Sequence, residues 1–150
     1  MFRKLYATLV KNKYKAAIFI LLAAASAGCV LLVGARVIYS DTFGHTSLIW
    51  NLFLAWIPFV LAYLAYMLSW SRKLLIIVMP ILAFLWLIFL PNAPYLLTDL
   101  QDLTKPVAGA PLWYDVIILI WFSWTGMLMG VVSLYLMQEI VARTLHPIVG

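Results

Sequence analysis

Charge is scarce in this sequence. Only 10% of the side chains are charged, whereas 67% are hydrophobic, and an ordinary soluble domain has about 25% charged residues. Four stretches contain no charged side chain at all, namely residues 16–35, 46–71, 74–98 and 116–138. Each helix of a soluble bundle needs a polar face toward water, and these stretches cannot supply one. The scarcity of charge therefore excludes a soluble helical bundle.

The uncharged stretches have the length of membrane spans. A helix needs about 20 apolar residues to cross a hydrocarbon core of about 30 Å, and each stretch reaches or exceeds that length. We predict an all-α fold in a single domain of residues 1–150, a polytopic membrane helix bundle with transmembrane helices at about residues 16–35, 48–70, 74–90 and 116–138.

Cysteine is almost absent, since Cys29 is the only one. A single thiol excludes an intramolecular disulfide bond and a thiolate metal cluster. The segment Ser26-Ala27-Gly28-Cys29 behind a basic N-terminus is similar to a lipoprotein cleavage site, but apolar residues continue to Val33 and three more spans follow. This favours an uncleaved first helix, with Cys29 as a buried thiol near its middle.

Acidic residues are the scarcer charged group, at five against ten basic residues. The net charge of +5 would suggest a nucleic-acid partner for a soluble domain, but here the basic residues collect on one side of the predicted spans. With the N-terminus inside, Arg36 and Lys105 lie outside, and eight basic residues lie inside: Arg3, Lys4, Lys11, Lys13, Lys15, Arg72, Lys73 and Arg143. The positive-inside rule thus predicts a multi-pass inner-membrane protein with both termini inside and no nucleic-acid partner.

The first 15 residues combine basic side chains with apolar ones at near-helical spacing. Such a segment can lie on the inner leaflet, with its lysines reaching anionic lipid headgroups. A frayed tail is an equally good interpretation, and both stay open here.

Two prolines and an asparagine interrupt the third apolar run, in the sequence Pro91-Asn92-Ala93-Pro94. Proline ends a helix or stands in its first turn, and asparagine is a frequent N-cap. We predict that a helix ends near Leu90 and that Asn92 caps a short interfacial helix at about residues 93–103.

Helical spacing divides the predicted interfacial helix into two faces. Tyr95, Asp99 and Asp102 share one face, which we expect to line an outer recess. The other face, expected to point into the membrane, carries Leu96, Leu100 and Leu103.

Polar and aromatic residues of the other spans are expected near the same recess. Asn51 at the outer end of the second span needs a partner, either in the broken stretch or in an ordinary interhelical hydrogen bond. Trp113, Tyr114 and Asp115 open the last span, where two aromatic residues suit the membrane interface. The candidate ligand-binding residues are therefore Asn51, Asn92, Tyr95, Asp99, Asp102, Trp113, Tyr114 and Asp115.

Three carboxylates in a partly dry recess repel one another, so we expect a bound cation or a retained proton to relieve that repulsion. The weak metal-ligand candidates are Asp99, Asp102 and Asp115, with His45 in the outer loop. Their spacing matches no metal motif, and we predict no cofactor. The alternative is that these residues are solvated and only mark the outer surface.

The last predicted span carries small residues on one face: Ser123, Gly126, Gly130 and Ser133. Small residues at this spacing let another helix approach closely. We predict tight packing along this face.

Several separated motifs resemble one known family: Trp50-Asn-Leu-Phe-Leu-Ala-Trp-Ile-Pro58, Phe89-Leu-Pro-Asn-Ala-Pro-Tyr95 with Thr98-Asp-Leu100, Trp113-Tyr-Asp115 and Phe122-Ser-Trp-Thr-Gly126. They look like the uncharacterised membrane family called domain of unknown function 1361, over about residues 46–143. The resemblance implies a bacterial polytopic membrane protein and no particular activity. It also implies further C-terminal spans, so we expect this chain to correspond to the N-terminal part of such a protein.

No phosphate-binding loop, His-x-x-x-His pair or Ser-His-Asp set appears in the sequence, and whether the protein is an enzyme stays open. The outer acidic residues favour a ligand-binding or transport component with an acidic vestibule, although few polar residues at mid-membrane depth count against transport. The alternatives are a membrane enzyme acting on a lipid-linked substrate and a structural or assembly subunit. Beyond the lipid bilayer, the expected partners are a second copy of the chain or another membrane subunit.

Overall fold

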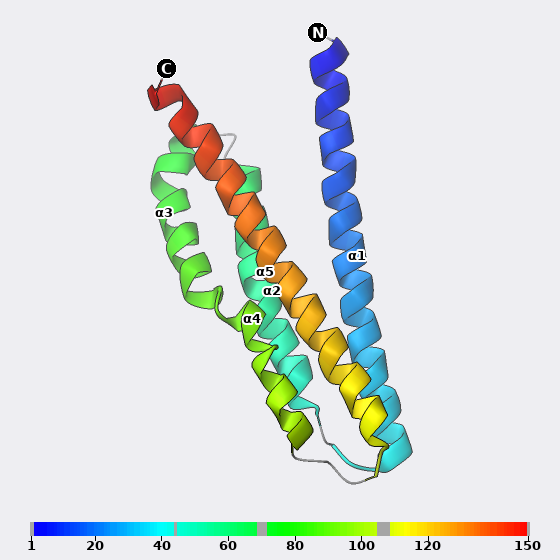
Figure 1. The fold of residues 1–150 in the computed structure, drawn as a ribbon. Coiled ribbons are helices and arrows are strands. Elements are labelled where there is room, and N and C mark those ends of the chain that lie inside the picture. The colour runs from blue at the N-terminus through cyan, green and yellow to red at the C-terminus, as the bar shows by residue number, and fades with distance from the viewer. Residues whose placement is uncertain (1, 44, 69–71, 105–108, 150) are drawn as a thin grey trace.

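A computed structural model describes residues 2–43, 45–68, 72–104 and 109–149, with side chains described in 14–43, 45–68, 78–101 and 109–142. The described residues are helical apart from short connections (Figure 1). The elements are α1 Phe2–Ser40, α2 Ser47–Leu68, α3 Arg72–Phe89, α4 Asn92–Tyr95, the 3-10 helix η1 Thr98–Thr104, and α5 Leu112–Val149.

Four helical segments among the described residues are long and apolar enough to cross a membrane. They are Tyr14–Ser40, Ser47–Leu68, Val78–Gln101 and Leu112–Ala142. The protein is therefore an integral membrane helix bundle, as predicted. Both termini lie at the same end of the bundle (Figure 1), as an even number of crossings requires. We call the opposite end, where residues 41–46 and 109–111 connect helices, the distal end.

The first helix is longer than the sequence predicted at both ends. The segment at residues 2–15 and the predicted span at 16–35 form one continuous helix that ends only at Ser40. The N-terminal segment is therefore the first part of α1, and its contact with anionic lipid headgroups stays a prediction. Arg36, expected in an outer loop, lies inside α1, because no proline interrupts the helix before Ser40.

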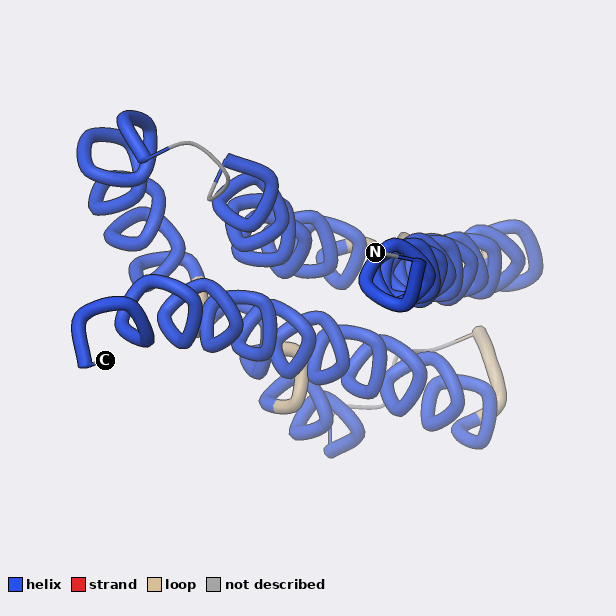
Figure 2. The backbone as a smooth tube through the Cα atoms, turned by 90° about the horizontal axis from the view of Figure 1, so that it is seen from above, coloured by secondary structure: helices blue, strands red, loops and turns tan. Residues whose placement is uncertain are grey.

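Helices α2 and α5 form the centre of the bundle. α5 packs against α1, α2, α4 and η1, and α3 packs against α2. α1 and α3 lie on opposite sides of the bundle (Figures 1 and 2). The largest fully buried apolar side chains include Phe59 on α2 and Phe122 and Met129 on α5. Most of the described α3 surface is exposed, as expected of a helix that faces lipid.

The break after the third helix lies where the sequence predicted it, but its local structure differs. α3 ends at Phe89, and the chain continues as one α-helical turn and then η1. Asn92 makes no N-cap bond, and its side-chain amide instead donates to the carbonyl oxygen of Phe89 at 3.1 Å. The predicted Asn92 cap is wrong. The side chain of Asn92 binds a backbone carbonyl at the end of α3 instead of the first N–H groups of α4.

The segment after the break does not have the orientation that the sequence predicted. It packs along α2 and α5 instead of standing apart from the bundle (Figure 1). Leu96 is fully buried and Leu100 is partly buried against the core, while Tyr95 is 54% exposed. The expectation that the leucines face the membrane is therefore wrong for Leu96, and the side chain of Leu103 lies outside the described residues.

The small face of α5 receives this segment, which confirms the predicted tight packing. A Cβ atom on Gly126 would lie 2.8 Å from the carbonyl oxygen of Ala93 and in contact with Leu96. A Cβ atom on Gly130 would lie 3.2 Å from that of Ala93. Ser123 donates a hydrogen bond to the carbonyl oxygen of Leu96 at 2.7 Å. The two glycines thus make the notch into which α4 fits.

Polar side chains away from the helix ends have partners across the bundle. The indole N–H groups of Trp56 and Trp86 donate to the hydroxyls of Ser26 and Ser133, at 3.1 and 3.3 Å. Cys29 is buried as predicted, and its sulfur lies 3.6 Å from the hydroxyl oxygen of Thr125. Such hydrogen bonds join helices where lipid offers the donors no partner.

A lysine–carboxylate pair joins α1 to α5 toward the terminal end. Lys15 Nζ lies 3.1 Å from Glu139 Oε2 and 3.2 Å from the centre of the Tyr66 ring. The charge of Lys15, which the sequence interpreted as a topology signal, is therefore held by a carboxylate and an aromatic face.

Candidate functional site: a pocket at the distal end of helices α1 and α5

A buried ion pair joins the distal ends of α1 and α5. Arg36 Nε donates to Asp115 Oδ1 at 2.6 Å, and Nη2 donates to Asp115 Oδ2 at 3.2 Å. The side chains are 0% and 5% exposed, respectively. Two parallel N–H···O bonds fix the orientation of both groups. The charge of Asp115 is thus neutralised by a cation that the sequence placed in a loop.

The segment after α1 folds back over this pair. Arg36 Nη1 donates to the hydroxyl oxygen of Thr42 at 3.2 Å, and that oxygen lies 2.8 Å from the Ser40 hydroxyl. Asp41 and His45 have positive φ angles of 49° and 66°. Non-glycine residues seldom adopt this backbone conformation, so the tight turn is held by its contacts with α1.

His45 is buried beside the same carboxylate. Its Nε2 atom lies 3.5 Å from Asp115 Oδ2, and the side chain is 5% exposed. That distance exceeds the usual N–H···O range of about 2.7–3.2 Å, and Nε2 has no hydrogen-bond partner among the described residues. An ion pair forms here only when the imidazole carries a second proton.

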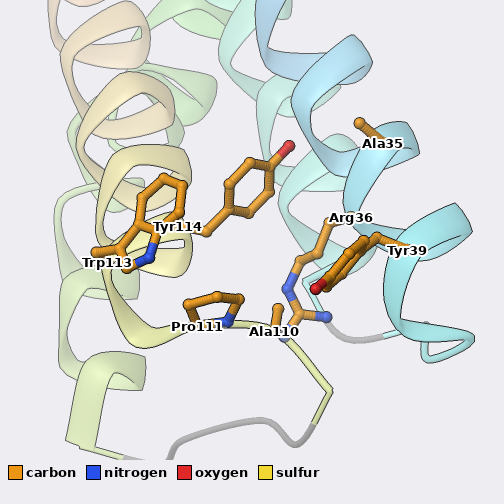
Figure 3. A pocket seen from close by; sticks show the side chains of 7 residues that line it. All are labelled: Ala35, Arg36, Tyr39, Ala110, Pro111, Trp113 and Tyr114. Carbon is orange, nitrogen blue, oxygen red and sulfur yellow. The ribbon is translucent and has the colours of Figure 1, made fainter.

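A pocket of about 370 Å³ lies against this ion pair. Figure 3 shows the side chains around it: those of Ala35, Arg36 and Tyr39 come from α1, and those of Ala110, Pro111, Trp113 and Tyr114 come from the start of α5 and the residues before it. We call it the distal pocket. Its lining is largely apolar, and the side chain of Arg36 in its wall is 0% exposed.

The walls of the distal pocket are fixed by contacts between the two chain segments. The Tyr114 hydroxyl donates to the carbonyl oxygen of Leu32 at 3.0 Å, and the Trp113 and Tyr114 rings meet edge to face with centroids 5.7 Å apart. Gly109 has a φ of 98°, and a Cβ atom there would lie 2.9 Å from that of Ser40. Only glycine suits that position.

A second polar contact joins α2 to η1. Asn51 Nδ2 donates to Asp99 Oδ2 at 2.9 Å, and Asp99 is 9% exposed. The sequence predicted that Asn51 would find its partner in the broken stretch or in an ordinary interhelical hydrogen bond. The partner lies just after the break, and the contact fixes η1 against α2.

Two of the three carboxylates that were predicted to repel one another in the recess are held by other groups. Asp115 pairs with Arg36, Asp99 accepts a hydrogen bond from Asn51, and the side chain of Asp102 lies outside the described residues. Within the described side chains, no group of three or more His, Cys, Asp or Glu residues could hold a metal ion. Of the predicted ligand-binding residues, Trp113 and Tyr114 line the distal pocket and Asp115 lies behind it.

Arg36 and Tyr39 were not among the predicted site residues. The available clue was that Arg36 follows a 20-residue uncharged run directly. A cation at that position is either solvated beyond the helix or paired within it. The sequence alone favoured a solvated Arg36, whereas in the structure Arg36 is paired within the helix bundle.

The helices and the buried polar contacts together define a four-span integral membrane protein. The family model described as a protein of unknown function (DUF1361) matches residues 50–149. The chain belongs to this family, which confirms the resemblance noted from its motifs. No curated protein and no solved structure matches it. The matched part contains the α5 side of the distal pocket, whereas α1 precedes it.

Proposed function

We propose that this is a bacterial inner-membrane protein that binds an amphiphilic ligand from the outer leaflet in the distal pocket. The pocket itself carries the proposal: about 370 Å³ lies within the usual range of about 300–1,000 Å³ for small-molecule sites. Such sites combine an apolar lining with a few fixed polar groups, and here the fixed polar group is Arg36, oriented by two bonds to Asp115.

The surface next to the pocket suits an apolar chain. A second hollow, of about 450 Å³, lies between α1 and α5 and is lined by Ala25, Ile117, Ile120, Trp121, Trp124, Thr125 and Leu128. Helical spacing places Trp113, Ile117 and Trp124 on one face of α5, and all three are exposed. A ligand with its polar end in the distal pocket can therefore lay an apolar tail along this face.

An acidic vestibule that binds a cation is the less favoured function for the distal end. Both described aspartates of the predicted recess already have a partner, Arg36 for Asp115 and Asn51 for Asp99. A carboxylate neutralised by a buried guanidinium attracts a cation weakly. We therefore replace the acidic vestibule with an amphiphile site.

The proposal needs the distal end to face outward. The eight-to-two distribution of basic residues supports that orientation, and the basic residues 3–15 would then meet the anionic lipids of the inner leaflet.

In a Cys29→Ser background, Asp41→Cys should react with a membrane-impermeant thiol reagent in intact cells. Thr144→Cys should react only after the cells are opened. Asp41 is exposed at the distal end, and Thr144 lies in the last turns of α5. Labelling can be read on a gel with a mass-shifting maleimide. The reverse pattern would overturn the orientation.

Filling the pocket should abolish binding. The probe is a long-chain alcohol with an environment-sensitive fluorophore, titrated into protein purified in an uncharged detergent. We expect Ala35→Trp to weaken binding by about tenfold or more, because Ala35 lines the pocket and the indole would take up part of its volume.

Ala27→Trp is the matched control, since Ala27 is also exposed on α1 and does not line the pocket. Its affinity should stay within about twofold of the wild type. Equal affinities of the two tryptophan variants, or no saturable binding by the wild type, would count against the proposed function.

A further inference from the structure

We propose that the distal pocket selects an anionic amphiphile and that His45 makes this selection depend on protons. When His45 takes up a proton, it pairs with Asp115 and redirects one N–H group of Arg36 toward the anionic group of the ligand. The inference rests on the proposed function, because it assumes that the pocket is occupied by a ligand.

The geometry around Asp115 assigns each of its oxygens a different role. Oδ1 accepts the short bond from Arg36 Nε, at 2.6 Å. Oδ2 accepts the longer bond from Nη2, at 3.2 Å, and lies 3.5 Å from His45 Nε2. A small movement of the imidazole would bring Nε2 within hydrogen-bond range of Oδ2. The longer of the two arginine bonds is therefore the one with which a protonated His45 would compete.

The charges around Asp115 favour its pairing with His45 at low pH. The charged or titratable groups near His45 in the described structure are Asp115 on α5, Arg36 on α1, and Asp41 on its own segment, which is exposed. With a neutral imidazole, the charges of Arg36 and Asp115 cancel, whichever ring nitrogen carries the proton. A second proton makes both ring nitrogens donors and gives the three buried groups a net charge of about +1.

A net positive charge behind an apolar pocket selects a particular ligand chemistry. Arg36 lines the distal pocket itself, and Figure 3 shows its guanidinium between Tyr39 and the residues that precede α5. Phosphate, sulfonate and carboxylate groups all accept the planar N–H fork of arginine. The ligand class is therefore an amphiphile with an anionic headgroup and an apolar body, bound more tightly in acid.

The test compares two fluorescent probes with the same alkyl chain, one ending in a sulfonate and the other in an alcohol. The sulfonate keeps its charge throughout the range from about pH 5.5 to about pH 8, in which histidine titrates. We expect the wild type to bind the sulfonate about fivefold or more tightly at the lower pH. Its affinity for the alcohol should change little.

His45→Gln keeps a polar side chain but cannot become charged, so the ratio of sulfonate affinities at the two pH values should fall to about one. Asp41→Asn is the matched control, because it removes the neighbouring titratable group from the same segment and should keep the wild-type ratio. A ratio in His45→Gln equal to that of the wild type would overturn the inference, as would a wild type with no pH dependence.

A second measurement needs no ligand and detects the exchange in the protein itself. The proposed pair of His45 and Asp115 exists only in the folded state, so the inference requires a contribution to stability that is present in acid and lost as the pH rises. The melting temperature of the wild type should exceed that of His45→Gln by more at about pH 5.5 than at about pH 8. An equal difference at both pH values contradicts the proposed pairing.

The two proposals fail in different ways. If both probes bind and Ala35→Trp blocks them, but the sulfonate shows no preference for acid, only the present inference fails. If neither probe binds in a saturable way, the proposed function fails and this inference falls with it.

Discussion

Asp115→Asn should lower the free energy of unfolding by about 3–5 kcal/mol, the cost of removing one partner from a buried ion pair. The substitution keeps the size of the side chain but leaves the Arg36 guanidinium, which is 0% exposed, without its counter-charge. We expect the loss to appear as a large fall in melting temperature, or in the midpoint of denaturation by a charged detergent, measured at about pH 8, above the range in which free histidine titrates.

Two further variants separate this effect from a general loss of charge. Asp41→Asn removes a carboxylate from the same end of the molecule, but Asp41 is exposed, so its effect should be within about 0.5 kcal/mol. The double variant Arg36→Met with Asp115→Leu replaces both charges with apolar groups, and such replacements are often neutral or stabilising. If Asp115→Asn and Asp41→Asn have the same melting temperature, the ion pair does not hold α1 against α5.

Gly126→Leu should be the most damaging substitution in α5. The first added atom would already lie 2.8 Å from the carbonyl oxygen of Ala93 and would contact Leu96. The Ala93 carbonyl belongs to the backbone and cannot move away by a change of rotamer. Overpacking of this kind costs about 1–3 kcal/mol or more. Here it would also push α4 out of its notch and weaken the hydrogen bond from Ser123 to Leu96. The effect can be measured as the loss of folded protein in a size-exclusion thermal assay.

Gly34 offers a matched control because it is also a glycine within a membrane helix. A Cβ atom added there would meet nothing within 4 Å, so Gly34→Leu adds the same side chain to open space. It should be tolerated and should gain up to about 1 kcal/mol of helix propensity in a water-based scale. Equal destabilisation by the two substitutions would show that the notch does not determine the packing of α4.

Local features of the sequence determined much of the fold. The four uncharged runs predicted the four helices that can cross a membrane, because the hydropathy of a span depends on its own residues. Pro91 and Pro94 located the end of α3 to within a residue or two, since two prolines this close together disfavour a continuous helix. Pro58 and Pro80, by contrast, lie inside α2 and α3. The small face of α5 predicted a close neighbour, because small side chains on one helical face let another segment of backbone approach closely.

The tertiary structure alone decided which groups meet. Arg36 and Asp115 lie 79 positions apart, and each taken singly looks like a charged residue at a helix end. Asn51 and Asp99 lie 48 positions apart, and the sequence left open whether Asn51 pairs with the broken stretch. His45 looks solvated in the sequence, but its side chain is buried in the fold. A local pattern indicates which side chains share a helical face but not which neighbour that face meets. The partner depends on how helices from distant parts of the chain pack, and that packing turned a predicted acidic recess into a neutralised ion pair beside an apolar pocket.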